Sequence, residues 1–382
     1  PDTELSFRTA NFESNEKTQE DDVMEWRWLS NRELVDIPSE AFITDVKQRD
    51  FQKGIALVDY WWSGFGKLML NTAEHINADN ANWVMITAQN DFVNTKDFVK
   101  IRENNQEYKD ELRERIVNTK DSGLNVMLKL KLCCNNPPRS NYTAEWWDSW
   151  FNETSKLISE YSAIAEEAGA DSLLIDYSYG NSIPDELYSP RNAKNEWYEI
   201  IHDIRSSYSG KLGFNFYLGG MYRDVTLFWP ENAKMFSLDV DFYGVEIWTG
   251  LSFKKDASQT EINKNAEKVV DNLGNFATRL NKPFIITGAV YSTVNGCSLG
   301  VNNITTLIPG ISPWDPPNPE LVFDPAEQAM IYEGYLRALA LDDRLDGFYS
   351  YGYWPVDLSD SNDYSVRSKE AEVVVRDWYS RF

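Results

Sequence analysis

The chain is short of the residues on which several kinds of active site depend. It has only two His, His75 and His202, and three Cys among its 382 residues. Both His fall in segments that we expect to be helical, and the Cys follow no metal-binding spacing. The sequence therefore argues against a Ser-His-Asp triad and against a His- or Cys-rich metal centre. We expect neither a cofactor nor a metal, and we interpret the Cys as mainly buried thiols.

Long apolar runs and positive charges are also scarce. No stretch of about 18 apolar residues occurs, so the sequence predicts no membrane-spanning helix. Asp and Glu outnumber Lys and Arg by 60 to 37, which gives a formal net charge of −23. Such a surface repels phosphate, so nucleic acids and anionic membranes are poor partners and a neutral or cationic ligand is favoured.

The N-terminal segment differs from the rest of the chain. Its first stretch of about 22 residues is polar and acidic and has no apolar core of the kind a signal peptide needs. We interpret it as a mature N-terminus or a tether left after processing, and we expect a secreted or cell-surface protein, extracellular or periplasmic. Residues 1–45 are taken as an N-terminal extension and residues 46–382 as a single domain.

From about residue 50 onward, short apolar strands alternate with longer amphipathic helices. This alternation is typical of βα units around a parallel sheet, and eight strands predict a (β/α)8 TIM barrel. The expected strands are 54–58, 83–87, 125–131, 172–176, 211–217, 242–247, 284–287 and 347–351. The expected helices are 67–76, 107–119, 144–169, 195–208, 261–280, 325–341 and 368–379.

Three of these strands end at an acidic residue set among aromatic residues. The first delivers Asp59, the fourth Asp176 and the sixth Glu246. Active groups in this fold lie at the C-terminal ends of the strands. A carboxyl group beside Tyr and Trp suits sugar cleavage, because the acid performs the chemistry while flat rings hold the apolar faces of the sugar.

Glycoside hydrolysis requires two carboxyl groups across the scissile bond. Strands four and six lie two apart around the barrel, so Asp176 and Glu246 can face each other across its mouth. We predict Asp176 as nucleophile or base and Glu246 as proton donor, since the apolar neighbour Trp248 favours a protonated carboxyl group. The alternatives are structural: an ion pair between Asp176 and Lys129 or Lys131, and a similar supporting role for Glu246.

Aromatic residues make up 14% of the chain, including 14 Trp and 20 Tyr, an excess of Trp over what packing alone usually requires. We expect several residues near strand ends to contact sugar and others to pack the rim. The predicted substrate-binding residues are Asp59, Trp61, Trp62, Tyr177, Tyr179, Asn215, Tyr217, Trp248, Tyr291, Tyr353 and Trp354. A long irregular segment, residues 291–324, follows strand seven; loops of this length inside a barrel are usually either functional or disordered.

Several segments carry a resemblance to a known group of proteins. They are Lys-Gly-Ile at 53–55, Ala-Asn-Trp-Val at 81–84, Gly-Leu-Asn-Val-Met-Leu-Lys at 123–129, the helix leading into strand four at 147–171, and Asp-Tyr-Ser-Val-Arg-Ser-Lys-Glu-Ala-Glu at 363–372. Over residues 50–382 the chain resembles the clan of (β/α)8 glycoside hydrolases that includes the β-mannanases of glycoside hydrolase family 113. The resemblance implies a barrel that acts on glycosidic bonds.

The chain departs from that family's catalytic pattern. The resemblance implies an acid/base Glu near position 178, where Ser178 stands, and a nucleophilic Glu in a Thr-Glu pair ending strand seven, where the chain has Thr287 and Gly288. Two hypotheses follow: a glycoside hydrolase with a relocated carboxylate pair, acting on an oligosaccharide or polysaccharide, or a non-catalytic carbohydrate-binding barrel. A sugar-phosphate enzyme is disfavoured by the charge and by the lack of a Gly-rich phosphate loop.

Overall fold

The computed structural model describes residue 46 and residues 49–58, 69–94, 99–102, 104–133, 143–176, 193–218, 239–300, 321–357 and 359–382. The chain divides after Asp45, and all the described residues belong to the unit Val46–Phe382. Within them, no helix combines the length and the apolar character that crossing a membrane requires.

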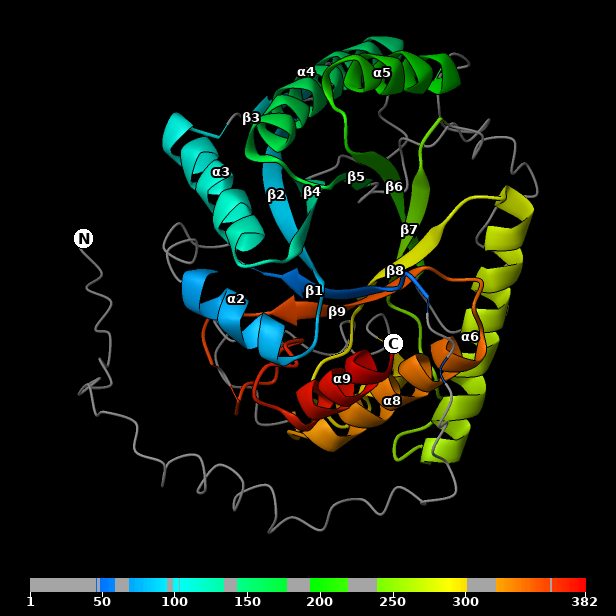
Figure 1. Ribbon diagram of the computed structural model, residues 1–382. Helices are drawn as coiled ribbons and strands as arrows, with labels where there is room; N and C mark the ends of the chain where they lie inside the picture. The colour runs from blue at the N-terminus through cyan, green and yellow to red at the C-terminus, as the bar shows by residue number, and fades with distance from the viewer. Residues whose placement is uncertain are drawn as a thin grey trace, which may run out of the picture. The chain divides into compact units, whose positions relative to one another are not determined.

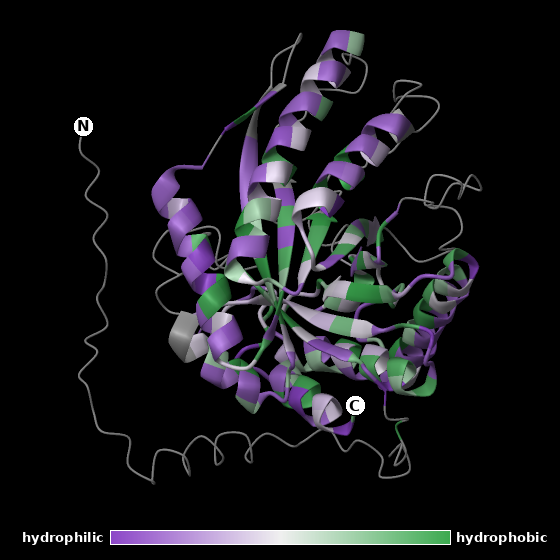
Figure 2. Cartoon of the chain, turned by 45° about the horizontal axis from the view of Figure 1, so that its top comes forward, coloured by the Kyte–Doolittle hydropathy of each residue, from purple (hydrophilic) through white to green (hydrophobic). Residues whose placement is uncertain are grey.

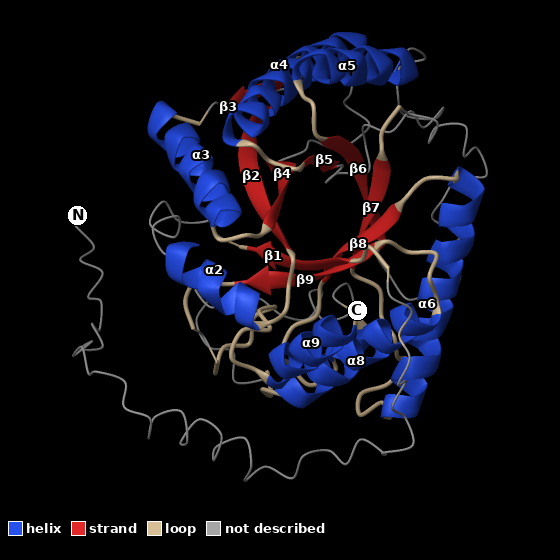
Figure 3. Cartoon of the chain, in the orientation of Figure 1, coloured by secondary structure: helices blue, strands red, loops and turns tan. Residues whose placement is uncertain are grey.

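Eight parallel strands form a closed barrel, which confirms the predicted (β/α)8 fold (Figure 3). The strand β1 pairs with both β2 and β9, and this double pairing closes the ring. The barrel strands are β1 (Gln52–Leu57), β2 (Trp83–Asn94), β4 (Asn125–Cys133), β5 (Ser172–Asp176), β6 (Lys211–Leu218), β7 (Phe242–Ile247), β8 (Phe284–Ala289) and β9 (Gly347–Tyr353).

The second strand is longer than the sequence suggested. It was expected to end at residue 87, but β2 runs to Asn94 and pairs in antiparallel register with an additional strand, β3 (Val99–Arg102). The strand β2 also pairs in parallel register with β4, as far as Asp91 opposite Cys133. The polar residues at 89–91 hid this continuation; pairing with β4, and at Asp91 also with β3, holds them in the sheet despite their low strand propensity.

The helices lie around the outside of the strands (Figure 1). Their ends carry the signals that stop and start helices: Thr143 caps α4 by accepting from the Trp146 amide, and Gly169 ends it at a positive φ of 74°. The described helices are α2 (Met69–Ala78), α3 (Gln106–Asp121), α4 (Ala144–Ala168), α5 (Ala193–Ser207), α6 (Gln259–Leu280), α8 (Pro325–Leu341) and α9 (Glu370–Arg381).

Large side chains fill the interior of the barrel toward the N-terminal ends of its strands, and two glycines make room for them. A Cβ at Gly54 would lie 2.2 Å from Cδ1 of Tyr349, and one at Gly213 would lie 2.2 Å from Cζ of Phe242. The apolar layer consists of Ala56, Trp83, Met85, Met127, Leu174, Phe242, Ile285 and Tyr349. Figure 2 shows the outer faces of the helices as mainly hydrophilic, in line with a core that sits between helices and strands.

Three of the 14 Trp pack in an aromatic cluster between α4, α5 and β6. Trp150 contacts Trp197 edge to face at 6.0 Å between ring centroids, and Trp197 contacts Phe214 at 5.2 Å. Trp147 and Phe151 extend the cluster along α4. All five rings are buried. Edge-to-face pairs of this kind contribute about 0.5–1.5 kcal/mol each beyond the area they bury.

The same side-chain hydrogen bond recurs at the N-terminal end of the barrel, at every second barrel strand. An Asn or Asp just before β2, β5, β7 and β9 accepts a hydrogen bond from a backbone amide of the preceding barrel strand. The pairs are Asn82 with Lys53, Asp171 with Val126, Asp241 with Leu212, and Asp346 with Phe284, at 2.7–2.9 Å. These four side chains therefore stabilise the fold at the end of the barrel opposite to the predicted active site.

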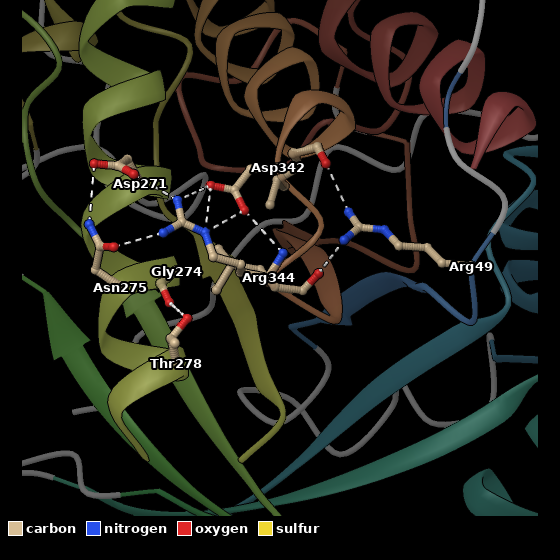
Figure 4. Close-up of polar contacts among 9 residues, drawn as sticks. Arg49, Asp271, Gly274, Asn275, Thr278, Asp342 and Arg344 are labelled. Carbon is tan, nitrogen blue, oxygen red and sulfur yellow. Dashed lines mark hydrogen bonds and ion pairs between the residues drawn. The ribbon is translucent and has the colours of Figure 1, made fainter. Parts of the chain in front are cut away.

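An arginine network joins the loop between α8 and β9 to α6 (Figure 4). The guanidinium of Arg344 donates to Asp342, to Asp271 and to the side-chain oxygen of Asn275. It lies over Gly274, where a Cβ would come within 2.6 Å of Nε of Arg344. The two carboxylates raise the pKa of Arg344 further above its usual value. These contacts tie the loop that leads into β9, the last barrel strand, to α6.

A buried carboxyl group between α2 and α9 makes stability depend on pH. Asp79 is 2% exposed, Glu372 lies beside it, and Arg376 supplies a counter-charge at 3.9 Å. Burial, with repulsion from Glu372 added, raises the pKa of Asp79 to about 8. The folded state therefore binds a proton that the unfolded chain releases near pH 4, and the free energy of unfolding falls as the pH rises from about 4 to about 8.

Replacing Asp79 with Asn should remove this part of the pH dependence. We expect the variant to be more stable than the wild type near pH 8 and to differ less from it near pH 5, because Asn carries no charge to bury. Urea unfolding at both pH values measures this, with the exposed Asp121→Asn as control. Parallel pH profiles for Asp79→Asn and the wild type would contradict the assignment.

Candidate active site

The structure describes about half of the residues predicted for the site. Asp59, Trp61, Trp62, Tyr177 and Tyr179 lie outside the described residues. Asp176 is the last residue of β5 and stands in backbone register with Asn215 on β6, but its side chain is also outside the described part. The site can therefore be built from β4, β6, β7, β8 and β9.

Glu246 is the centre of the described site. Its side chain is 0% exposed, near the C-terminal end of β7. The ammonium of Lys129 on β4 donates to Oε2 at 2.5 Å, and the indole Nε1 of Trp248 donates to Oε1 at 2.7 Å. Strands β5 and β6 separate β4 from β7, so the ion pair spans the barrel interior. The sequence suggested Asp176 as an ion-pair partner of Lys129; the structure shows an ion pair of Lys129 with Glu246, which was not predicted.

These hydrogen bonds give both carboxyl oxygens of Glu246 a protein partner. The ammonium of Lys129 and the indole N–H of Trp248 can only donate, so both oxygens of Glu246 serve as acceptors. The role of Glu246 as proton donor stays a prediction from the sequence.

Strand alternation brings these polar residues to the same level of the barrel. Lys129 follows Met127 by two positions on β4, and Met127 lies in the apolar layer, so both face inward. On β7, Phe242 belongs to that layer, and Glu246 follows it by four positions. The sequence thus places a polar layer directly above an apolar one.

A second polar contact crosses the same layer. Asn215 and Thr287 are both buried, and the Thr287 hydroxyl donates to Oδ1 of Asn215 at 2.6 Å. Strand β7 lies between them, and Gly244 on it leaves room, since a Cβ there would lie 2.6 Å from Asn215 Oδ1. Asn215 was predicted to contact substrate; the structure gives its oxygen a protein partner.

Three half-buried aromatic rings lie near the carboxylate, with Trp248 next to the other two. Trp248 lies with its ring centroid 6.3 Å from Tyr217 on β6 and 6.3 Å from Tyr351 on β9. The Lys129 ammonium lies 5.8 Å from the centroid of Tyr217. Sequence reasoning missed Tyr351, although its spacing of two from the inward-facing Tyr349 was a usable signal.

Three other predicted sugar contacts are packed inside the protein. Tyr291 is fully buried, and its hydroxyl donates to the Thr249 carbonyl. Tyr353 is fully buried and donates to Glu372. Trp354 is almost fully buried beside Val58. Their burial leaves no open ring face in this structure, so we do not include these residues in the site.

The loops after β7 and β8 brace each other beside the site. The amides of Leu251 and Ser252 both donate to the Ser298 carbonyl, at 2.7 and 2.9 Å. Glu327 of α8 in turn accepts from the amides of Gly296 and Ser298. The described part of the segment 291–324 thus includes an ordered turn at Cys297–Leu299, and Cys297 is a buried free thiol, as expected. Burial raises its pKa well above the usual value.

Gly288 on β8 faces the same mouth. A Cβ at this position would lie 3.1 Å from Cγ of Glu246 and 3.2 Å from Cδ2 of Tyr351. Glu246 stands in backbone register with Gly288, at a shift in the pairing between β7 and β8. The absence of a side chain at 288 therefore leaves the space that the Glu246 side chain uses.

The chain combines a closed eight-stranded barrel with a buried carboxylate that accepts a hydrogen bond from a tryptophan near the C-terminal ends of the strands. The sequence model of glycoside hydrolase family 113 matches residues 66–370. The chain belongs to glycoside hydrolase family 113. Within the described part of this family member, no group of three or more His, Cys, Asp or Glu side chains is placed to hold a metal ion.

Solved structures share the fold at low sequence identity. A family 113 β-1,4-mannanase in a complex is 19% identical, with a TM-score of 0.66 over 87% of this chain and 100% of that one. The family 113 β-mannanase AaManA from Alicyclobacillus acidocaldarius, in complex with ManMIm, is 17% identical, with a TM-score of 0.64 over 88% and 99%. A family 5 mannosidase from Rhizomucor miehei is 11% identical, with a TM-score of 0.55 over 87% and 92%. Among curated proteins, none matches the chain in sequence.

The substitution Gly288→Ala tests whether this glycine makes room for the carboxylate. We expect a loss of about 1–3 kcal/mol in the free energy of unfolding, because the methyl group crowds Glu246 and Tyr351. Urea unfolding measures the loss. In the double variant with Glu246→Ala the added methyl gains space, so the two effects should be non-additive. Additive effects would show that Gly288 and Glu246 do not share this space.

Proposed function

We propose that this family 113 protein is a glycoside hydrolase that cleaves an oligosaccharide or polysaccharide with two carboxyl groups, Asp176 and Glu246. The observation that carries the proposal is the buried carboxylate of Glu246, near the C-terminal end of β7, which accepts from Trp248; the rings of Tyr217 and Tyr351 each lie 6.3 Å from the Trp248 ring centroid. Active groups of this fold lie at that end, and sugar rings stack on aromatic side chains.

Asp176 is the second carboxyl group of the proposed pair. It ends β5, and only β6 separates β5 from β7. Leu174, two residues earlier on β5, packs in the apolar interior, and strand alternation favours the same face for residue 176. Retaining enzymes hold their carboxyl groups about 5–5.5 Å apart and inverting enzymes about 6.5–9.5 Å, and neighbours two strands apart suit either range.

Several features indicate the class of substrate without fixing the sugar. The net charge of −23 disfavours anionic chains and leaves neutral glycans as the first choice. The names of the similar structures refer to mannanases and a mannosidase, so β-1,4-linked mannan is the first glycan to test. Action on such a polymer would also fit the secreted or cell-surface location that we predict from the sequence.

One observation favours a second candidate, a carbohydrate-binding barrel without catalysis. Both oxygens of Glu246 already have protein donors, and the residue is buried as a member of an ion pair. A carboxylate held in this way can serve structure alone, since buried charges are normally paired. Binding of a glycan without cleavage would support this candidate.

Product release from a panel of α- and β-linked glycans, mannans included, tests the proposal. We expect the wild type to cleave at least one, and Asp176→Asn and Glu246→Gln to lose about 10²-fold or more of that activity, because each removes one carboxyl group. The exposed Glu267→Gln on α6 is the control and should keep full activity. Full activity in both site variants would refute the assignment of the pair.

A further inference from the structure

The loop that follows β9 adds an aromatic residue, Tyr364, to the rings near Glu246. Building on the proposed function, from which the class of ligand is taken, we propose that Tyr364 binds a sugar unit of a neutral glycan. We further propose that the buried ion pair between Asp363 and Lys369 positions it. Tyr364 belongs to the segment 363–372, which carries part of the family resemblance and which the proposed carboxyl pair leaves without a role.

Tyr364 continues a row of ring contacts that starts beside the buried carboxylate. Tyr217 contacts Trp248, and Trp248 contacts Tyr351, each at 6.3 Å between ring centroids. The ring of Tyr364 lies 6.1 Å from that of Tyr351, at an interplanar angle of 74°. All four rings are half-buried, and Trp248 donates to Glu246. The row therefore leads from the carboxylate to the loop after β9.

The residues on either side of Tyr364 are buried and held by hydrogen bonds. Oδ1 of Asp363 accepts from the ammonium of Lys369 at 2.9 Å and from the amide of Ser365 at 2.6 Å. The Asp363 carbonyl accepts from the amide of Thr293, in the loop after β8, at 3.0 Å. The ion pair thus closes the turn around Tyr364, and the Thr293 amide ties this turn to the neighbouring loop.

Two contacts fix the backbone of Tyr364 itself. Nε2 of Gln328 on α8 donates to the Tyr364 carbonyl at 3.3 Å. Gly352 on β9 has a positive φ of 86°, and a Cβ there would lie 2.8 Å from Cβ of Tyr364. The turn therefore rests directly on the strand. A side chain held in this way is ordered before a ligand arrives, which lowers the entropy cost of binding.

The hydroxyl of Tyr364 is available to a ligand. It makes no hydrogen bond within the part of the chain that the structure describes, whereas the hydroxyls of Tyr291 and Tyr332 donate to backbone carbonyls. Burial raises the pKa of Tyr364 to about 12, so near neutral pH the phenol keeps its proton and can donate as well as accept. A half-buried ring with such a hydroxyl suits a sugar, which offers an apolar face and hydroxyl groups.

The ion pair also bears on the charge of the ligand. Asp363 and Lys369 offset each other, and both side chains are buried, so the pair places no net charge beside Tyr364. This surrounding suits a neutral sugar unit better than a charged one. Because Tyr351 stands between Tyr364 and Trp248 in the row, we expect Tyr364 to contact a unit beyond the one beside Glu246. The ligand would then be an oligosaccharide or a longer glycan.

Retardation in native gels that contain soluble glycans tests this inference separately from cleavage. The probes are galactomannan, glucomannan, arabinoxylan and mixed-linkage β-glucan, and migration at several concentrations gives a Kd. We expect the wild type to bind at least one. Tyr364→Ala should raise that Kd about tenfold or more, and Tyr364→Phe about 2–10-fold, because it keeps the ring and loses one hydrogen bond. Tyr198→Phe on α5 is the matched control and should bind as the wild type does.

Urea unfolding distinguishes a ligand contact from a structural role. Tyr364→Phe should unfold at the wild-type midpoint, because the hydroxyl has no protein partner within the described residues. An unchanged Kd in Tyr364→Ala would overturn the inference, as would a wild type that binds none of the four glycans. A wild type that binds without cleaving would refute the proposed function and leave this inference standing.

The role of the ion pair is tested through its coupling to Tyr364. Lys369→Met should raise the Kd in the wild-type background but change it little in the Tyr364→Ala background, because the pair acts through that side chain. Lys369→Arg keeps the charge and should restore part of the affinity. Equal losses in both backgrounds would show that the pair does not position Tyr364. If Lys369→Met does not fold, the two Tyr364 variants still decide whether Tyr364 contacts the glycan.

Discussion

The contact on which the site depends is the buried ion pair between Lys129 and Glu246. It links β4 and β7 across the barrel interior, above the apolar layer that fills the lower part. Removing one member of such a pair leaves an uncompensated buried charge, at a cost of about 3–5 kcal/mol. The pair therefore shapes both the stability of the barrel mouth and the charge that a sugar would meet there.

Glycines on the neighbouring strands make this arrangement possible. Gly244 leaves room for the hydrogen bond between Thr287 and Asn215, and Gly288 leaves room for the Glu246 side chain. The resemblance seen in the sequence implies a Glu at position 288, where this chain has glycine. In the structure the side chain of Glu246, on the adjacent strand, lies where a side chain at position 288 would begin.

The sequence predicted the fold well because strands and helices follow local periodicity. The strands at 172–176 and 242–247 and the helix at 325–341 were predicted with the bounds that the structure shows. Contacts between distant strands could not be predicted in this way. No local feature of the sequence identifies Glu246 as the partner of Lys129. By sequence Tyr291 resembles an aromatic residue of the rim, but in the structure its hydroxyl donates to the Thr249 carbonyl. The extension of β2 likewise depends on pairing with β3, a tertiary effect.

The buried ion pair between Lys129 and Glu246 is the central claim, and a double-mutant cycle in urea unfolding measures it directly. Lys129→Met and Glu246→Gln should each lower the free energy of unfolding by about 3–5 kcal/mol, and the double variant should lose far less than the sum, because each single change leaves the other member of the pair buried alone. Additive losses would contradict the account, because they would show that the two side chains do not stabilise each other.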